Sequence, residues 1–347
     1  MNALPPGLLT LGLVAAFGLA PTDLHASEGQ RHRIGINTRI AFRVEATFRN
    51  LGEYRSPMNP GPERGGGTDR FYEDGFVRVD ASGNADGGTW YWGYEDSERQ
   101  VVGDTVQMQV LEAPGGLTSS VHDDPHAGVE LRYGYVWRSD PRALWLLEAA
   151  LGWTEFDFTD RRTLTGPARR TVDTFPLDGV VPPWAAPAEP YSGSFAGPGP
   201  ILGDAPIRTS ETRPDGLVLE GERRLRTSLG TLRLGPAVEV PWTEQWSAQF
   251  GAGLALALAD GEFTRSETLS PWAGPPVRRS GGTSDTEFLV GAYAEGLVHV
   301  TWPRGFGLFA GAQYQYLPDF RQALEGQEAV VRFSRGFFLI AGLRYGF

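Results

Sequence analysis

Hydrophobic and polar residues alternate along most of the chain after residue 35. In segment 36–49, apolar side chains such as Ile36, Ile40 and Phe48 share one face, and Arg39 and Arg43 lie on the other. A period of two predicts a β-strand, and about 14 residues is long beside the usual 5–6. Seven more such segments lie at 127–138, 143–158, 223–241, 245–262, 284–302, 305–317 and 329–347. The segment at 223–241 changes phase near Gly230, which predicts a β-bulge there.

The connections between these eight segments alternate in length. Short ones lie at 138–144, 243–245 and 303–305, whereas long ones lie at 50–126, 159–222, 263–283 and 318–328. Short turns at one end and long loops at the other predict an all-β, up-and-down antiparallel barrel with an even number of strands. We expect eight strands, with ten as the alternative if the region around 89–110 also crosses. Closure of the last strand on the first removes both sheet edges.

Large aromatic residues gather at the short turns. They are Trp137, Trp145, Trp242, Trp246, Trp302 and Phe306, and Tyr345 and Phe347 reach the same level at the end of the last strand. Tryptophan and tyrosine combine an apolar body with a polar tip, which suits a membrane–water interface. On a soluble sheet they would form a large exposed apolar patch. The pattern therefore predicts an aromatic girdle around one rim of a membrane barrel.

This layout resembles that of small bacterial outer-membrane β-barrel proteins of the eight-stranded OmpA, OmpX and OmpW type. The resemblance rests on alternating strands, short turns, long outer loops and the terminal Arg344-Tyr345-Gly346-Phe347. It implies a location in the bacterial outer membrane, contact with its lipid, and Phe347 as an assembly signal read by the barrel assembly machinery. The short apolar run at 7–20 predicts a signal peptide over 1–26, removed on export, followed by a single barrel domain over 27–347.

Composition narrows the class of protein further. The 347 residues carry a net charge of −11, with no cysteine and with arginine as the only basic side chain besides five histidines. Absence of cysteine excludes disulfides and thiolate sites. The acidic balance argues against nucleic acid as a partner, because no basic stripe exists to displace counterions from phosphates.

Polar residues that alternate with the apolar face are expected to point into the barrel. The charged members of this set are Arg39, Arg43, Glu45, Glu130, Arg132, Glu148, Arg233, Glu239, Glu287, Glu295, His299, Arg332 and Arg344. Eight strands enclose little more than their own side chains, so paired charges that plug the lumen are the favoured interpretation. A polar ion path or a cavity for a small ligand are the alternatives, because lumen glycines leave some space.

The two longest loops are expected to carry function at the cell surface. Asp80, Ser82, Asn84 and Asp86 alternate as in a calcium loop, but Ala85 and Tyr91 replace its glycine and glutamate, so turn residues are the favoured interpretation. The aromatic run at 89–94 could form a hairpin with 104–110. Packing of these aromatics onto the loop itself, or at the outer membrane interface, is the favoured interpretation, and binding of a surface carbohydrate or protein is the alternative. The proline- and glycine-rich stretch within 159–222 predicts extended coil.

Catalytic chemistry has little support in the sequence. His122 and His126 flank two aspartates and suggest at most an adventitious metal site, and His299 with Thr301 only faintly resembles the His-x-Ser arrangement of outer-membrane lipid A deacylases. We therefore predict no catalytic residues, no cofactor and no metal, and a protein that is not an enzyme. The expected role is structural or surface recognition through the long loops. The alternatives are a narrow porin or hydrophobic-solute transporter, a soluble ligand carrier, and a lipid-modifying enzyme.

Overall fold

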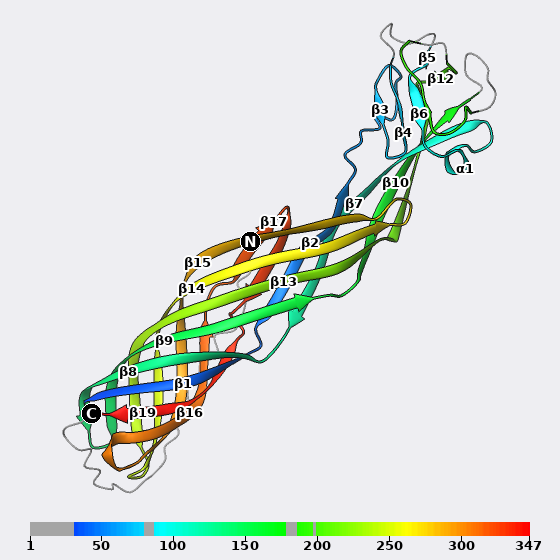
Figure 1. Cartoon of the computed structure of the whole chain (residues 1–347). Helices are drawn as coiled ribbons and strands as arrows, with labels where there is room; N and C mark the ends of the chain where they lie inside the picture. The colour runs from blue at the N-terminus through cyan, green and yellow to red at the C-terminus, as the bar shows by residue number, and fades with distance from the viewer. Residues whose placement is uncertain (1–30, 80–86, 178–185, 197–198) are drawn as a thin grey trace, which may run out of the picture.

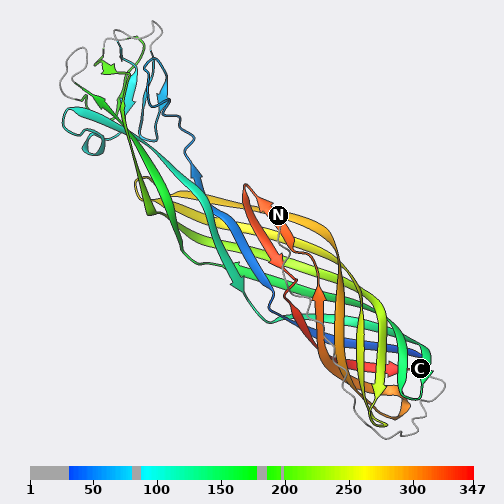
Figure 2. The ribbon, with the colours of Figure 1, turned by 180° about the vertical axis from the view of Figure 1, so that it is seen from behind.

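The computed structural model describes residues 31–79, 87–177, 186–196 and 199–347. The molecule is elongated, with long strands running along its axis and small sheets gathered at the end opposite the C-terminus (Figures 1 and 2). Within these ranges, no helix is long and apolar enough to cross a membrane. The helical turns there are α1 (Ser97–Gln100) and a 3₁₀ turn at Pro303–Gly305.

The main sheet has thirteen strands, not the eight that the sequence predicted. They are β1 (His32–Phe42), β2 (Glu45–Arg55), β7 (Thr105–His122), β8 (His126–Asp140), β9 (Ala143–Asp160), β10 (Leu164–Pro176), β13 (Ile207–Pro241), β14 (Trp246–Pro271), β15 (Val277–Thr301), β16 (Phe306–Tyr316), β17 (Phe320–Leu324), β18 (Gln327–Arg332) and β19 (Phe337–Gly346). Much of the sequence expected to be loop is therefore strand, including all of β7, β10 and β17.

Eight of these strands pair in a circuit at the C-terminal end of the molecule. In order they are β14, β15, β16, β19, β1, β8, β9 and β13, and β13 pairs in turn with β14. The last strand lies against the first, with Ile34 opposite Tyr345. We call these eight strands, over the part where the circuit is complete, the lower ring.

Farther from the C-terminus, some strands exchange partners. Beyond Arg223, β13 leaves β9 and pairs with β10 through 207–219. The order there is β15, β14, β13, β10, β7, β2, β18 and β17, which we call the upper sheet. Strands β13, β14 and β15 run through both parts (Figure 1), so the upper sheet is joined to the lower ring by continuous hydrogen-bonded backbone.

Strand length exceeds what a membrane requires. Strand β13 alone has 35 residues, or about 115 Å at about 3.3 Å per residue. A transmembrane β-strand needs only about 9–11 residues. The predicted bulge near Gly230 is absent, because β13 keeps one unbroken register with β9 from Arg223 to Glu239.

The first predicted strand is broken instead of continuous. Arg43 has a φ of 60°, in the left-handed region, and its N–H donates to Asp124 Oδ2 at 2.7 Å. This break sends β1 into the lower ring and β2 into the upper sheet. The last predicted segment breaks at the same level, between β18 and β19, where Arg332 pairs with Glu45 across the sheet.

The far end of the upper sheet carries a small head (Figure 2). Its sheets are formed by β3 (Arg70–Phe71), β4 (Gly75–Val77), β6 (Trp92–Tyr94) and β11 (Tyr191–Ser192), and by β5 (Gly88–Thr89) with β12 (Leu202–Gly203). Trp92, Tyr94, Met108 and Phe175 are buried in its core. The run at 89–94 is therefore largely core, in agreement with aromatics that pack the loop onto itself. The predicted hairpin with 104–110 is wrong, because β6 pairs with β4 and β11.

Candidate functional site

The outward face of the lower ring is apolar, and the outward face of the upper sheet is polar. Strand β14 shows both: Phe250, Leu254 and Leu258 are 58%, 45% and 53% exposed. On the same face beyond them lie Asp260 and Glu262, both exposed. Exposed apolar rows continue on neighbouring strands, with Ile36 on β1, Leu131 on β8, Leu151 on β9, Phe288 on β15 and Leu343 on β19.

The side chains inside the molecule also differ between the lower ring and the upper sheet. Inside the lower ring, buried polar side chains such as Glu130 and Gln249 lie among apolar ones such as Leu297. Inside the upper sheet, Phe48, Phe158 and Phe263 pack together beside the buried ion pair of Arg223 with Glu267. Near Gly230, the apolar residues of β13 switch from one face of the strand to the other, and this switch lies at the boundary between the two parts. Below it the outward residues are Leu232 and Leu234, and above it they are Ser228 and Arg226, so the environment changes while the strand stays regular.

The predicted aromatic girdle residues are all exposed at the short-turn end of the lower ring. Trp137, Trp145, Trp242, Trp246, Trp302, Phe306, Tyr345 and Phe347 each have more than a third of their surface free. Some contact one another: the ring centroids of Phe306 and Tyr345 are 4.8 Å apart, and those of Trp137 and Trp145 are 6.4 Å apart.

One cluster of buried charges occupies the middle of the lower ring. Arg233 Nη2 donates to Glu130 Oε1 at 2.7 Å, and Arg233 Nη1 donates to Glu295 Oε2 at 2.8 Å. Arg132 bonds both of these carboxylates. Arg39 Nη1 lies 3.4 Å from Glu130 Oε2 and donates to Thr231 Oγ1 at 3.0 Å. Partly buried Glu148 accepts from Gln249 Nε2 beside this cluster.

A glycine makes room for this cluster. A Cβ on Gly152 would lie 2.4 Å from Arg39 Nη1 and 2.7 Å from Thr231 Oγ1. The sequence suggested that lumen glycines leave a passage. At this position the space is occupied by a guanidinium group instead.

A second cluster lies nearer the aromatic rim. Glu239 accepts from Arg344, from Ser247 Oγ at 2.5 Å, and from Arg33, which the sequence analysis did not select. Arg344 also donates to Thr301 Oγ1 at 2.5 Å. His299 is 3% exposed and packs against Phe309 inside the ring. His299, on which the faint resemblance to lipid A deacylases rests, therefore lies on the inner face of the ring, away from its apolar outer surface.

Four predicted lumen residues lie elsewhere. Arg43 and Glu287 are exposed at the end of the lower ring and on β15, and Glu45 pairs with Arg332 at 3.6 Å where β2 meets β18. The prediction assumed that one alternation phase extends along each whole segment. The backbone breaks at 43–44 and 333–336 separate Arg43, Glu45 and Arg332 from the lower ring, whereas Glu287 lies on β15 beyond the end of its pairing with β16 at Ala292.

The two histidines at 122 and 126 lie in different surroundings. His126 is 8% exposed and packs between Phe156 and Phe158, while His122 is largely exposed near Glu45. Among the described residues, no group of three or more His, Cys, Asp or Glu side chains is placed to hold a metal ion. The calcium-like residues 80–86 and the predicted signal segment lie outside the described residues.

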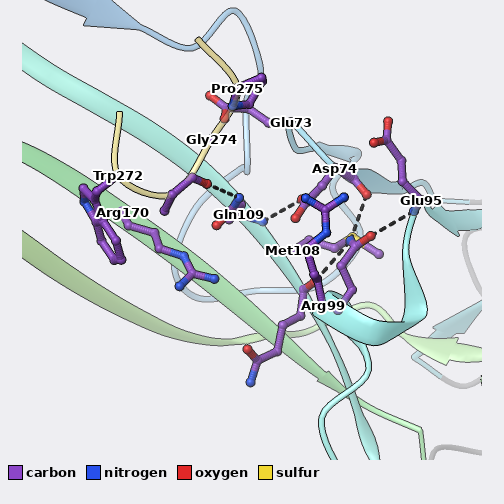
Figure 3. Close-up of a pocket in the computed structure, with 13 residues that line it drawn as sticks. Glu73, Asp74, Glu95, Arg99, Met108, Gln109, Arg170, Trp272, Gly274 and Pro275 are labelled. Carbon is purple, nitrogen blue, oxygen red and sulfur yellow. Dashed lines mark hydrogen bonds between the residues drawn. The ribbon is translucent and has the colours of Figure 1, made fainter. Parts of the chain in front are cut away.

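An open pocket of about 760 Å³ lies where the head meets the upper sheet. Figure 3 shows Trp272 and Arg170 on one side of it, Asp74, Glu95 and Arg99 on the other, and Gln109 between them. The walls come from the β3–β4 turn, the α1 region, β7, β10 and the β14–β15 turn. Sequence analysis missed this pocket because five separated segments build it.

Hydrogen bonds fix the acidic wall of the pocket. Asp74 Oδ1 accepts from the Gln109 N–H at 2.9 Å, and burial raises the pKa of Asp74 to about 6 despite that bond. Glu73 Oε1 accepts from the Tyr54 hydroxyl at 2.9 Å. Burial, with the Glu73 carboxylate beside it, raises the pKa of Tyr54 to about 12. The carboxylates are thus held by the strand backbone and by a neighbouring phenol.

Four polar atoms of the pocket walls are shielded from water and have no hydrogen-bond partner among the described residues. Two are acceptors, Glu73 Oε2 and Gln109 Oε1, and two are donors, Arg170 Nε and Trp272 Nε1. A buried polar group without a partner costs about 1–3 kcal/mol. All four atoms belong to side chains that line this one pocket.

Comparisons with known proteins bear on the architecture. No protein-family model and no curated protein matches the chain. Among solved structures, the outer membrane protease OmpT from Escherichia coli is 8% identical, with 91% of this chain and 97% of that chain covered and a TM-score of 0.34. Ail, the attachment invasion locus protein of Yersinia pestis, in complex with the heparin analogue sucrose octasulfate, is 12% identical, with 91% and 99% covered and a TM-score of 0.22.

A Pseudomonas aeruginosa FadL homologue is 9% identical, with 91% of this chain and 90% of that chain covered and a TM-score of 0.16. These matches agree with the broad class of outer-membrane β-barrel proteins and do not single out the eight-stranded OmpA, OmpX and OmpW type. The sequence predicted that the chain is not an enzyme. That prediction is contradicted, because a protease is among the similar structures.

Proposed function

We propose that this chain is an outer-membrane protein whose lower ring is a closed eight-stranded barrel in the membrane and whose upper sheet and head project from the cell for surface recognition. The observation that carries the proposal is the inversion of side-chain polarity between the two parts. The lower ring is apolar outside and holds a network of paired charges inside, as expected in lipid. The upper sheet is polar outside around a core that contains packed phenylalanines, as expected in water.

The circuit of strand pairs supports this division. In hydrocarbon every backbone polar group must be bonded within the protein, and a ring of paired strands meets that requirement. On β14, the outward face becomes polar from Asp260 onward, toward the upper sheet. The short turns at the aromatic rim support an orientation with Phe347 on the periplasmic side, because outer-membrane barrels have short periplasmic turns.

The filled lumen gives less support to a porin or a solute carrier. Arg39, Glu130 and Arg233 form hydrogen bonds across it, and the apolar core of the upper sheet lies directly beyond. A permanent aqueous path would have to cross both. We therefore favour recognition by the projecting head over transport through the lumen.

Two single-cysteine variants test the topology, because the natural chain has no cysteine. Glu63→Cys lies in an exposed part of the head, and Arg304→Cys lies in an exposed short turn at the opposite end. In intact cells of a Gram-negative host, a membrane-impermeant maleimide is expected to label the Glu63→Cys variant alone. Both variants should react after the cells are broken.

Labelling of Arg304→Cys but not of Glu63→Cys in intact cells would reverse the orientation. Recovery of the protein in the soluble fraction without detergent would overturn the membrane assignment altogether. Both outcomes are independent of what the head binds.

A further inference from the structure

The head pocket has the features of a binding site for a polar ligand. Pockets for drug-like molecules span about 300–1,000 Å³ and are lined mainly by apolar groups. This pocket has that size, about 760 Å³, but its walls carry three carboxylates, two guanidinium groups and three glutamine side chains. Its size therefore suits a small ligand, and its lining suits one with many hydrogen-bonding groups.

The size also separates a small ligand from a folded protein partner. Thirteen residues line the pocket, whereas a standard protein–protein interface engages about 20–30 residues on each side. The pocket is concave and formed at the junction of five segments. This geometry favours an inserted chemical group over a broad contact surface.

The unpartnered atoms define the chemistry of that group. Glu73 Oε2 and Gln109 Oε1 require donors, and Arg170 Nε and Trp272 Nε1 require acceptors. A hydroxyl group donates one hydrogen bond and accepts others, so a row of hydroxyls can satisfy both kinds. In this arrangement the four atoms are shielded from water, so a ligand bonds them only after the side chains that carry them rotate toward it.

Charge narrows the ligand further. The carboxylates of Glu73, Asp74 and Glu95 against the guanidinium groups of Arg99 and Arg170 give a formal charge of −3 + 2 = −1. An anionic ligand would be repelled on balance, while an uncharged one would not. Pro275 adds apolar surface for the C–H face of a ring, whereas the Trp272 ring already carries the Arg213 guanidinium 3.6 Å from its centroid.

We propose that the head pocket binds a neutral oligosaccharide segment through the side chains of Glu73, Gln109, Arg170 and Trp272. The proposal rests on the proposed function in one respect, which is that the head is outside the cell and meets glycans there. The binding itself is a property of the folded protein and can be measured in detergent.

The test uses the refolded full chain and an array of neutral oligosaccharides (glucans, galactans, mannans and N-acetylhexosamine oligomers), with sulfated and uronic-acid glycans on the same array. At least one neutral probe is expected to bind, and its affinity is then measured by calorimetry. Glu73→Gln keeps the size of the side chain but removes the carboxylate and is expected to weaken binding by about tenfold or more, as for other hydrogen bonds to charged groups.

If the Glu73→Gln variant does not fold, Glu95→Gln at the exposed rim of the pocket is the second test, and it is expected to weaken binding by a few-fold. The matched control is Glu63→Gln, an exposed glutamate outside the pocket, which should bind as the natural chain does. The change of electrophoretic mobility on heating reports folding of every variant. Absence of binding to all neutral probes, preference for the anionic probes, or unchanged affinity in a folded Glu73→Gln variant would each overturn the proposal.

The two proposals fail separately. If the Glu63→Cys variant is labelled on intact cells but no neutral glycan binds, only the ligand assignment is lost. If a glycan binds the purified protein but the head is not labelled from outside, the pocket stands and the topology is wrong.

Discussion

Arg233 and Glu130 meet inside the lower ring although one whole strand, β9, separates their strands. Two hydrogen bonds join them, from Arg233 Nη2 to Glu130 Oε1 at 2.7 Å and from Arg233 Nε to Glu130 Oε2 at 3.2 Å. Both side chains are almost fully buried. Because neighbouring guanidinium and carboxylate groups extend this pair across the lumen, it ties together the walls of the ring.

Removing the cation of this pair is expected to destabilise the ring. Arg233→Met leaves buried Glu130 and Glu295 with fewer partners, and breaking a buried ion pair costs about 3–5 kcal/mol. The measurement is the urea midpoint of unfolding in lipid vesicles. Arg55→Met is the matched control, because Arg55 pairs with Glu53 at an exposed site, where a pair contributes about 0–1 kcal/mol. Equal losses for the two variants would contradict the role of the lumen cluster.

The natural protein is expected to give no steady channels in a planar bilayer. Side chains hydrogen-bonded across the lumen and the apolar core beyond it leave no continuous water column. A porin of known conductance, reconstituted in parallel, shows that insertion is efficient. Regular, long-lived current steps from the purified natural chain would show that ions pass.

The outward face of β14 offers a matched pair for locating the membrane. Leu254→Arg places a charge in the apolar belt, where such a change costs about 2–4 kcal/mol near the bilayer midplane. Ser266→Arg introduces the same residue twelve positions farther along the same face, at an exposed position opposite Glu222. We expect the unfolding free energy in vesicles to fall for the first variant only. Comparable losses would place Ser266 in the membrane too.

Asp74 predicts a pH dependence of head stability. Burial raises its folded pKa to about 6, above the value of about 3.9 for an unperturbed aspartate. The folded state therefore binds the proton more tightly than the unfolded state does. The contribution of protonated Asp74 to the free energy of unfolding is fully present below about pH 4 and is lost as the pH rises from about 4 to about 6.

Replacement by an uncharged isostere should remove that loss. Asp74→Asn retains an oxygen for the Gln109 N–H and is expected to stabilise the head by about 1–2 kcal/mol at pH 7–8, with little effect below pH 4. Limited proteolysis of the head across pH 4–8 measures the difference. A constant difference between the two proteins at every pH would rule out the titration of Asp74 as its cause.

The sequence alone determined the lower part of this protein. Alternation of Leu131, Tyr133 and Trp137 with Glu130 and Arg132 specifies a strand with one apolar face. Large aromatics at three short turns specify a common rim. These are local signals, because side-chain direction in a strand repeats every two residues whatever the strand pairs with.

The tertiary structure decided which face is inside and how far each strand extends. A barrel with its apolar face outside and a sheet with its apolar face inside have the same two-residue period. The switch of apolar residues between the faces of β13 near Gly230 therefore looked like a bulge until the pairing of β13 with both neighbours was known. The left-handed backbone at Arg43 then assigns β1 and β2 to different parts of the sheet. The head pocket depends on long-range contacts among five segments, because no local pattern relates Glu73 to Trp272, and only their positions in the fold bring them together.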